Sequence, residues 1–192
     1  MILGSHNSWS YITPKKWYQR LFNFISKCQD LDIKEQYKQG VRCFDLRVRF
    51  NKKGKLIVAH GFTEYPIDKF KLINDIRWLN SKKDCFIRVI HEVRFKWQYT
   101  QVSKAKFQEF CSQIESKYDN IKYWGGRNLY NWEVDYMFHD NPECKELYSS
   151  VCPPYLIDDL YPRHYAAQHN RVNIQKYKDR NLILLIDFIN LR

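Results

Sequence analysis

Short apolar runs alternate with amphipathic segments along most of the chain. Strands are predicted at residues 1–3, 41–50, 56–59, 85–93, 121–124 and 181–189. Several of these runs are almost continuously apolar, which is typical of strands buried on both faces of a parallel sheet. Helices are predicted at residues 14–28, 32–39, 67–79 and 103–117. Strands that alternate with helices favour an α/β fold with a parallel sheet, open or closed into a barrel.

Local signals support the ends of two of these helices. Thr13 and Pro14 suit the N-cap and first position of the helix at 14–28, and Gly40 suits the end of the helix at 32–39. Residues 125–173 show no regular pattern and are rich in Tyr, Asn, Pro and charged residues. A stretch this long is expected to hold short helices and to form part of an active-site rim.

Composition narrows the class of protein without deciding its function. The 192 residues, 44% of them hydrophobic, are expected to form one domain over residues 1–192. The net charge of +11 favours an anionic partner, either nucleic acid or an anionic membrane surface. A basic surface on a soluble enzyme explains the charge equally well. No basic run is long enough for a nucleic-acid-binding arm, so no nucleic acid partner is expected.

Cysteine usage and hydropathy bear on the compartment. The six cysteines include no Cys-x-x-Cys pair, so the usual metal-ligand spacing is absent, and a reducing compartment is the simpler interpretation. No run is long enough to cross a bilayer. The sequence leaves the location open: the protein is either cytoplasmic or secreted after removal of a leader. In both cases it is expected to be peripheral at membranes. A monomer is expected.

Two histidines and an arginine are the best candidates for chemistry. His6 follows the first predicted strand and His60 follows the third, with Arg47 in the strand between them. Parallel α/β sheets place their active sites at the carboxyl ends of strands. A histidine titrates near pH ~6.5, so one imidazole can act as a base while the other acts as an acid. With a fixed positive charge from Arg47, this trio suits a metal-free phosphoryl transfer.

Acidic neighbours extend the candidate site. Asp45 shares a strand face with Arg47, and either Asp45 or a bound phosphate would be the partner of an inward-facing arginine. Asp187 lies near the end of the last apolar run and is expected to orient a histidine, a cap beyond the strand being the ordinary alternative. His91 and Glu92 end the 85–93 run and are expected at the same rim, where substrate contact and simple exposure both remain open.

These motifs resemble, in order, those of the X-domain family of phosphatidylinositol-specific phospholipases C. The first motif is matched by residues 4–8 (GSHNS), the second by Gln36 with residues 40–42 (GVR) and 44–47 (FDLR), and the third by residues 58–61 (VAHG). Asp187 with Phe188 resembles the family's last strand. The resemblance covers residues 1 to about 95 and implies a single-domain (β/α) barrel of the TIM type, distorted or incomplete.

The resemblance also implies an activity and roles for its residues. His6 would remove the proton from the inositol 2-hydroxyl, and His60 would protonate the departing diacylglycerol oxygen, leaving an inositol cyclic phosphate. Arg47 would stabilise the phosphoryl charge, Asp187 would support His6, and Asp45 would hold Arg47. Asn7, His91 and Glu92 are expected to contact the substrate, either a phospholipid or a soluble phosphodiester.

The same motifs bear on metal dependence. Metal-free bacterial members of the family carry an arginine where the calcium-dependent members carry an acid, and Arg47 occupies that position. Asn7 matches the calcium-dependent branch instead, and Asn7, Asp45 and Glu92 would supply oxygen ligands if Ca²⁺ bound. Because Arg47 would repel the ion, no metal and no other cofactor is expected.

The sequence also leaves two alternative functions and one membrane-contacting surface to be tested. A glycerophosphodiester or sphingolipid phosphodiesterase would use a similar barrel, but with acidic metal ligands in the second motif. A non-catalytic phosphoinositide-binding module would need no paired acid and base. Contact with an anionic membrane would use exposed aromatic residues, and Trp9 is the best candidate for the mouth of the site because it follows His6 closely.

Overall fold

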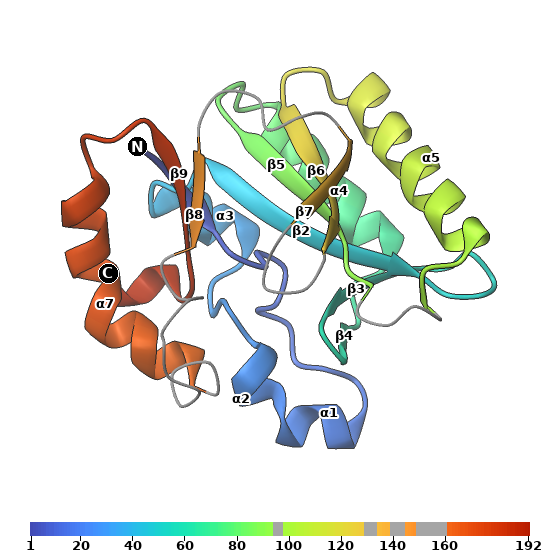
Figure 1. Cartoon of the computed structure of the whole chain (residues 1–192), viewed down its shortest axis with the longest axis horizontal. Coiled ribbons are helices and arrows are strands. Elements are labelled where there is room, and N and C mark those ends of the chain that lie inside the picture. The colour runs from blue at the N-terminus through green and yellow to red at the C-terminus, as the bar shows by residue number, and fades with distance from the viewer. Residues whose placement is uncertain (94–97, 129–133, 139–144, 149–160) are drawn as a thin grey trace.

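The computed structural model describes residues 1–93, 98–128, 134–138, 145–148 and 161–192 (Figure 1). A nine-stranded sheet forms the centre of this part of the chain. Its strands are β1 (Ile2–Ser5), β2 (Cys43–Phe50), β3 (Leu56–His60), β4 (Thr63–Tyr65), β5 (Phe86–His91), β6 (Lys122–Asn128), β7 (Val134–Phe138), β8 (Lys145–Tyr148) and β9 (Leu182–Ile186).

The sheet is mainly parallel and follows the order β7-β6-β5-β2-β1-β9-β8. All neighbours along β6-β5-β2-β1-β9-β8 are parallel, whereas β7 runs antiparallel to β6 at one edge. Strands β3 and β4 branch from β2 as antiparallel partners. Within the described residues β7 and β8 remain unjoined edges, so the sheet curves without closing. This is the incomplete α/β barrel that the alternating pattern and the resemblance predict.

Helices lie around this sheet, and the first two project below it in Figure 1. They are α1 (Trp17–Leu21), α2 (Asn23–Ser26), α3 (Ile33–Lys38), α4 (Lys69–Asn80), α5 (Gln101–Lys117) and α7 (Pro162–Tyr177), and a short 3₁₀ helix, η3 (Ile189–Leu191), follows β9. In Figure 1, α4 and α5 lie beside β2, β5 and β6, and α7 lies beside β9. The predicted helices at 32–39, 67–79 and 103–117 are confirmed within a few residues.

The two faces of β2 have opposite chemistry. Phe44, Leu46, Val48 and Phe50 pack into the main hydrophobic core, which includes residues of α4 and α5. Because alternate residues of a strand point to opposite faces, Asp45, Arg47 and Arg49 point into the curved side of the sheet. A small apolar cluster of Cys43, Trp124, Ile183 and Leu185 packs separately from the main core. Charged groups therefore share the inner face of the sheet with that small cluster.

The prediction of one helix over residues 14–28 is wrong. The segment forms two short helices, α1 and α2, and α1 begins after Lys16 without a side-chain cap. A helix is held in a fold by an apolar stripe against the core, but Trp17, Leu21 and Phe22 are exposed. By contrast, Gly40 adopts a φ of +84° after α3, as the end-of-helix prediction requires.

Regular structure also occurs where the sequence shows no pattern. β7, β8 and the 16-residue helix α7 lie in or next to residues 125–173. The remainder of that stretch lies outside the described residues. Among the helices that the structure describes, none is long and apolar enough to span a membrane. Four of the six cysteines lie in the described residues, and these four, Cys28, Cys43, Cys85 and Cys111, are buried and not in disulfides.

Candidate active site

His6 and Asp187 meet because β1 and β9 are parallel neighbours in register. Ser5 pairs with Ile186, so the next residue of each strand lies at the same level. The His6 backbone N–H donates to the Ile186 carbonyl at 3.0 Å. His6 Nδ1 lies 2.7 Å from Asp187 Oδ1, and both side chains are buried. Because the carboxylate accepts a hydrogen bond from Nδ1–H, it fixes the ring orientation and directs the Nε2 lone pair away from itself.

A buried charge network stands beside His6. Asp45 pairs in register with Arg88 across β2 and β5. The Asp45 carboxylate accepts from Arg47 Nε at 2.7 Å and from Arg88 Nη1 at 2.8 Å. Burial opposes ionisation of Asp45, but the charges of Arg47 and Arg88 outweigh it and hold the pKa of the Asp45 carboxyl well below its usual range. The network therefore fixes both guanidinium groups at the inner face of the sheet.

His60 reaches His6 by a different route from the one predicted. It ends β3, which is antiparallel to β2, and Val48 pairs with Val58. The return strand therefore carries His60 back toward the level of His6, and the two rings lie 5.2 Å apart between centroids at 89°. His60 Nδ1 lies 2.9 Å from the Ser26 carbonyl oxygen. Burial, followed by the charge of Arg47, lowers the pKa of His60 to about 4, so the ring is neutral near pH 7.

The residue after His60 is clamped from both sides. The Gly61 N–H donates to Glu92 Oε1 at 2.9 Å, and the Gly61 carbonyl accepts from Arg49 Nη1 at 3.0 Å. Glu92 also accepts from Arg47 Nη1 at 3.2 Å. Glu92, predicted to contact the substrate, is therefore placed where it positions both Arg47 and the His60 turn. Arg49 positions the same turn.

Asn7 brings a buried amide to the site. It adopts a φ of +42°, and its backbone N–H donates to Asp45 Oδ2 at 3.0 Å. Asparagine tolerates this left-handed conformation better than most residues. Its side chain is fully buried, and neither Oδ1 nor Nδ2 has a hydrogen-bond partner within the described residues. An unsatisfied buried amide costs free energy, which favours a ligand that would satisfy it.

His91 is placed away from the other candidates. It shares a face of β5 with Ile87 and Val89, which belong to the main core, and its ring stacks on Phe107 of α5 at 4.8 Å. Burial, and then the charge of Arg127, lowers the pKa of His91 to about 4. Because successive residues alternate between faces, His91 and Glu92 point to opposite sides of the sheet, so they do not share one rim as expected.

Two contributing residues escaped the sequence interpretation. Arg88 lies in an apolar run, where an inward-facing arginine needs a partner, and that signal was present in the sequence. Gln29 donates from Nε2 to the carbonyls of His6 (3.1 Å) and Ile186 (2.9 Å), so it ties the two strand ends together. No local pattern marks Gln29, because its role depends on contacts between distant segments.

The carboxylates proposed as calcium ligands are already engaged. Asp45 is bound by Arg47 and Arg88, and Glu92 by Arg47. A calcium ion at these oxygens would have to displace Arg47. Among the described residues, a different group has ligand atoms close enough for a metal, namely His6, Cys28 and His60.

A patch of exposed apolar side chains adjoins His60. Gln19 of α1 donates to the Phe62 carbonyl at 2.8 Å, and Ser26 at the end of α2 contacts His60, so these segments lie together. The interfacial patch consists of Trp17, Tyr18, Leu21, Phe22, Phe24 and Phe62, all 47–72% exposed. Trp9, predicted at the mouth of the site, is instead fully buried and donates to Asp75 at 3.1 Å.

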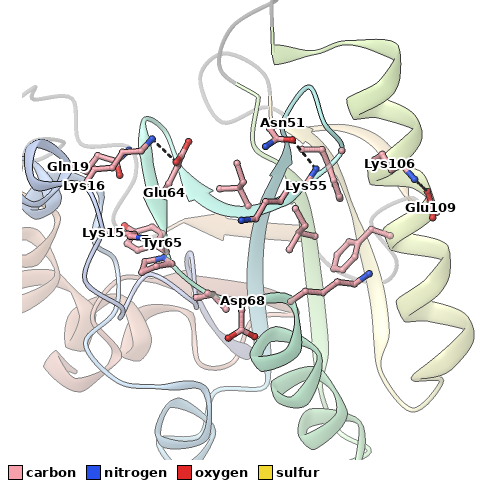
Figure 2. Close-up of a pocket in the computed structure, with 18 of the residues that line it drawn as sticks. Lys15, Lys16, Gln19, Asn51, Lys55, Glu64, Tyr65, Asp68, Lys106 and Glu109 are labelled. Atoms are coloured by element: carbon pink, nitrogen blue, oxygen red, sulfur yellow. Dashed lines mark hydrogen bonds and ion pairs between the residues drawn. The ribbon is translucent and has the colours of Figure 1, made fainter.

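A surface cavity of about 750 Å³ is lined by residues of β3, β4 and α5 (Figure 2). Two ion pairs lie in its lining, Lys16 with Glu64 at 2.9 Å and Lys106 with Glu109 at 2.6 Å. None of the predicted site residues lines it. The cavity is therefore distinct from the histidine site.

Comparisons with known proteins bear on the family and the fold. The family model described as "Phosphatidylinositol-specific phospholipase C, X domain" matches residues 5–122. A structure of the H258Y mutant of the phosphatidylinositol-specific phospholipase C from Staphylococcus aureus has a TM-score of 0.65 at 18% identity, with 97% of this chain and 84% of that chain covered. The Listeria monocytogenes enzyme has a TM-score of 0.63 at 15% identity, with 97% and 87% covered. No curated protein sequence matches the chain.

Proposed function

The chain belongs to the phosphatidylinositol-specific phospholipase C X-domain family, and from that premise we propose that it cleaves phosphatidylinositol or a related phosphodiester lipid. The observation that carries the proposal is the convergence of two histidines, one backed by a buried carboxylate, beside a fixed arginine. Simple binding of a phosphate needs the arginine but not a paired acid and base. The arrangement is therefore better suited to a phosphodiesterase than to a binding module.

His6 acts as the general base. Asp187 holds Nδ1 and stabilises the imidazolium that forms, as the acid of a catalytic triad does. Nε2 accepts the proton of the inositol 2-hydroxyl, and that oxygen attacks phosphorus to form the cyclic phosphate. Asn7, next in the chain and with a buried unsatisfied amide, is the candidate to hydrogen-bond the substrate.

Arg47 stabilises the charge that develops on the phosphoryl oxygens. A guanidinium group is planar and permanently charged, so it recognises phosphate oxygens without a change of protonation. Asp45 and Glu92 hold it in place before the substrate arrives, which removes the cost of reorganisation. This fixed charge does the work of a metal ion, and the proposal includes no metal cofactor.

His60 acts as the general acid once substrate is bound. With a pKa of about 4, it is neutral in the empty site. A bound phosphodiester anion beside the ring, which also offsets the charge of Arg47, favours the imidazolium. His60 then donates its proton to the diacylglycerol oxygen as the phosphorus–oxygen bond breaks. The residue is thus protonated when the substrate's charge is present.

The interfacial patch would bring the site to the lipid. Aromatic side chains insert into the interfacial region of a bilayer, and the net charge of +11 attracts the protein to anionic lipid. Trp17→Ala should weaken binding to phosphatidylinositol-containing vesicles by about tenfold or more, given the apolar area a tryptophan buries. Phe70→Ala on α4 is the matched control, because Phe70 is 76% exposed and lies outside the patch.

Phosphatidylinositol hydrolysis tests the proposal directly. The protein would be incubated with phosphatidylinositol vesicles, with and without EDTA, and inositol cyclic phosphate followed by ³¹P NMR. His6→Ala and His60→Ala should each lower the rate by about 10²–10⁴-fold. His169→Ala, on α7, is the control that should keep the rate. Full activity in EDTA is expected, and its loss would overturn the metal-free mechanism.

Other outcomes separate the alternatives. Vesicle binding without any product would favour a phosphoinositide-binding module. Cleavage of a glycerophosphodiester or sphingomyelin in preference to phosphatidylinositol would favour a different phosphodiesterase. Full activity of either histidine variant would contradict the acid–base roles.

A further inference from the structure

A cysteine lies where the two candidate catalytic histidines meet. Ligand atoms of His6, Cys28 and His60 all lie within 4.8 Å of one another, and Cys28 Sγ is 3.6 Å from His60 Nδ1. We propose that these three residues, the His₂Cys cluster, bind a zinc ion that inhibits the enzyme reversibly. The proposed catalytic mechanism uses the two histidines but not the thiol.

The donor set suits zinc. Zn²⁺ binds thiolate at about 2.3 Å and imidazole at about 2.0–2.1 Å, so tetrahedral ligand atoms lie about 3.3–3.6 Å apart. The present separations, up to 4.8 Å, require shifts of about an ångström. Three protein ligands would leave one tetrahedral position open for water, as in other zinc sites with three protein ligands.

The backbone around Cys28 fixes its position. The Cys28 N–H donates to Ser10 Oγ at 2.9 Å, and its carbonyl accepts from the Phe188 N–H at 2.6 Å. The side chain is 1% exposed, whereas His60 is partly exposed, so an ion would enter past His60. Cys28 therefore presents its thiol to the site from a segment that is anchored at both ends.

The hydrogen-bond acceptor beside the His6 ring also suits metal binding. Zinc-bound histidines usually donate their other ring N–H to a carboxylate or a carbonyl. His6 Nδ1 contacts the Asp187 carboxylate at 2.7 Å, and His60 Nδ1 contacts the Ser26 carbonyl at 2.9 Å. The Asp187 carboxylate places the proton of His6 on Nδ1 and so assigns the His6 ligand lone pair to Nε2. The His60 nitrogen that faces Cys28 Sγ at 3.6 Å is Nδ1, which would bind the ion in exchange for its contact with the Ser26 carbonyl.

The net charge around the cluster is compatible with a bound divalent cation. Three carboxylates (Asp45, Asp187 and Glu92) and two guanidinium groups (Arg47 and Arg88) surround the cluster, a net charge of one negative unit with neutral rings and thiol. Binding of Zn²⁺ replaces the Cys28 proton, which leaves to solvent. The ion and the thiolate together bring the sum to neutrality, and an uncompensated buried charge is costly.

Zinc would inhibit the enzyme because it would occupy a lone pair that the reaction needs. This part of the proposal rests on the proposed function. A metal on His6 Nε2 takes the electron pair that would accept the 2-hydroxyl proton. Removal of zinc by EDTA should therefore restore the rate, the opposite of the effect on a metal-dependent phospholipase.

Binding and inhibition can be measured separately. The EDTA-treated full chain would be titrated with ZnCl₂ by calorimetry, and with CoCl₂ by absorption, where a cobalt–thiolate charge-transfer band reports Cys28. One ion per chain is expected. Cys28→Ala should weaken zinc binding by at least about 100-fold, since even the loss of an outer-shell partner costs 10–100-fold. Cys111→Ala, another buried cysteine, is the control and should change nothing.

Each outcome bears on the proposal. Cys28→Ala should also keep its rate in EDTA and lose its sensitivity to zinc. Equal zinc affinity in Cys28→Ala and the unmodified chain, no cobalt–thiolate band, or activation by zinc would each overturn the site. If Cys28→Ala fails to fold, the cobalt band of the unmodified chain decides alone. Zinc binding at the cluster of a chain that never cleaves phosphatidylinositol would sink the proposed function and leave the metal site standing.

Discussion

Replacing Asp45 by asparagine should cost more stability than any single surface ion pair. The Asp45 carboxylate is fully buried and accepts from Arg47, Arg88 and the Asn7 backbone N–H. Asparagine keeps the size of the side chain but removes the charge that compensates the two buried guanidinium groups. The hydrogen bond to the Asn7 turn is also weakened, since its acceptor loses the charge.

The size of the expected stability loss follows from the burial of the ion pairs that Asp45 makes. Removing one partner of a buried ion pair typically costs about 3–5 kcal/mol, because the other charge stays uncompensated. For a chain of 192 residues each kcal/mol shifts the melting temperature by about 2–4 °C, so Asp45→Asn should lower it by about 6–20 °C. Asp84→Asn breaks the 2.7 Å pair with Arg42, which is partly exposed. That control should cost about 1 kcal/mol at most.

A double-mutant cycle with Arg88→Met isolates the interaction. Urea unfolding of the unmodified chain, both single variants and the double variant gives the coupling energy between Asp45 and Arg88. We expect about 1–3 kcal/mol, with the double variant more stable than the sum of the single losses implies. Additivity within about 0.5 kcal/mol, or a loss below about 1 kcal/mol for Asp45→Asn, would refute the account of the network.

Three further predictions concern Asp187, Asp45 and Gly125. Asp187→Asn should lower the hydrolysis rate by about 10³–10⁴-fold while circular dichroism still reports a folded chain, because the amide no longer stabilises the His6 imidazolium; a rate within tenfold of the original would contradict that role. The depressed pKa of Asp45 contributes stability above its unfolded value of about 3.9, which is lost as the pH falls toward its folded value. Urea unfolding between pH 5 and pH 3 should therefore show a smaller loss for Asp45→Asn than for the unmodified chain, and equal losses would be inconsistent with this. Gly125→Ala should cost more than about 3 kcal/mol in urea unfolding, because its Cβ would lie 2.0 Å from the Val89 carbonyl oxygen, whereas Gly54→Ala, also at a positive φ but with its nearest contact at 3.6 Å, should cost about 1 kcal/mol.

Much of the site could be predicted because it lies at the ends of neighbouring parallel strands. His6 and Asp187 each follow an apolar run, and parallel neighbours in register bring such positions together. Alternation along β2 similarly predicts that Asp45 and Arg47 share a face. These inferences need only the period of a strand, so the sequence carries them. The same rule, applied to β5, would have separated His91 from Glu92 and drawn attention to Arg88.

The route taken by β3 could also have been derived. Only residues 51–55 connect β2 to β3, and Asn51 and Gly54 are typical turn residues. A parallel crossover needs about a dozen residues, so this connection allows only an antiparallel return. Its consequence is that His60 approaches His6 from a hairpin rather than from an adjacent parallel strand.

Other features depend on contacts that no local pattern records. Helix α7 buries Pro162, Ala166 and Asn170, a stripe of small and polar residues that gives little amphipathic signal. Residues 14–28 carry apolar side chains that face outward, so their hydrophobicity predicts a longer helix than the chain forms. In both cases the partner surface, rather than the segment's own periodicity, decides the structure.

The assignment of base and acid rests on a difference that the sequence hides. His6 and His60 stand in similar frames, each after a short apolar run. In the folded chain the ring of His6 is held by a carboxylate, while that of His60 is held by the neutral Ser26 carbonyl. A carboxylate compensates a positive charge more strongly than a neutral carbonyl does, which is the contact expected beside the proposed base. His60, whose pKa burial and Arg47 lower to about 4, is neutral in the empty site and would carry a proton only beside a bound phosphodiester, as proposed for the acid. The proposed direction of proton flow, from the attacking hydroxyl to His6 and from His60 to the leaving oxygen, rests on this difference between the contacts of the two Nδ1 atoms.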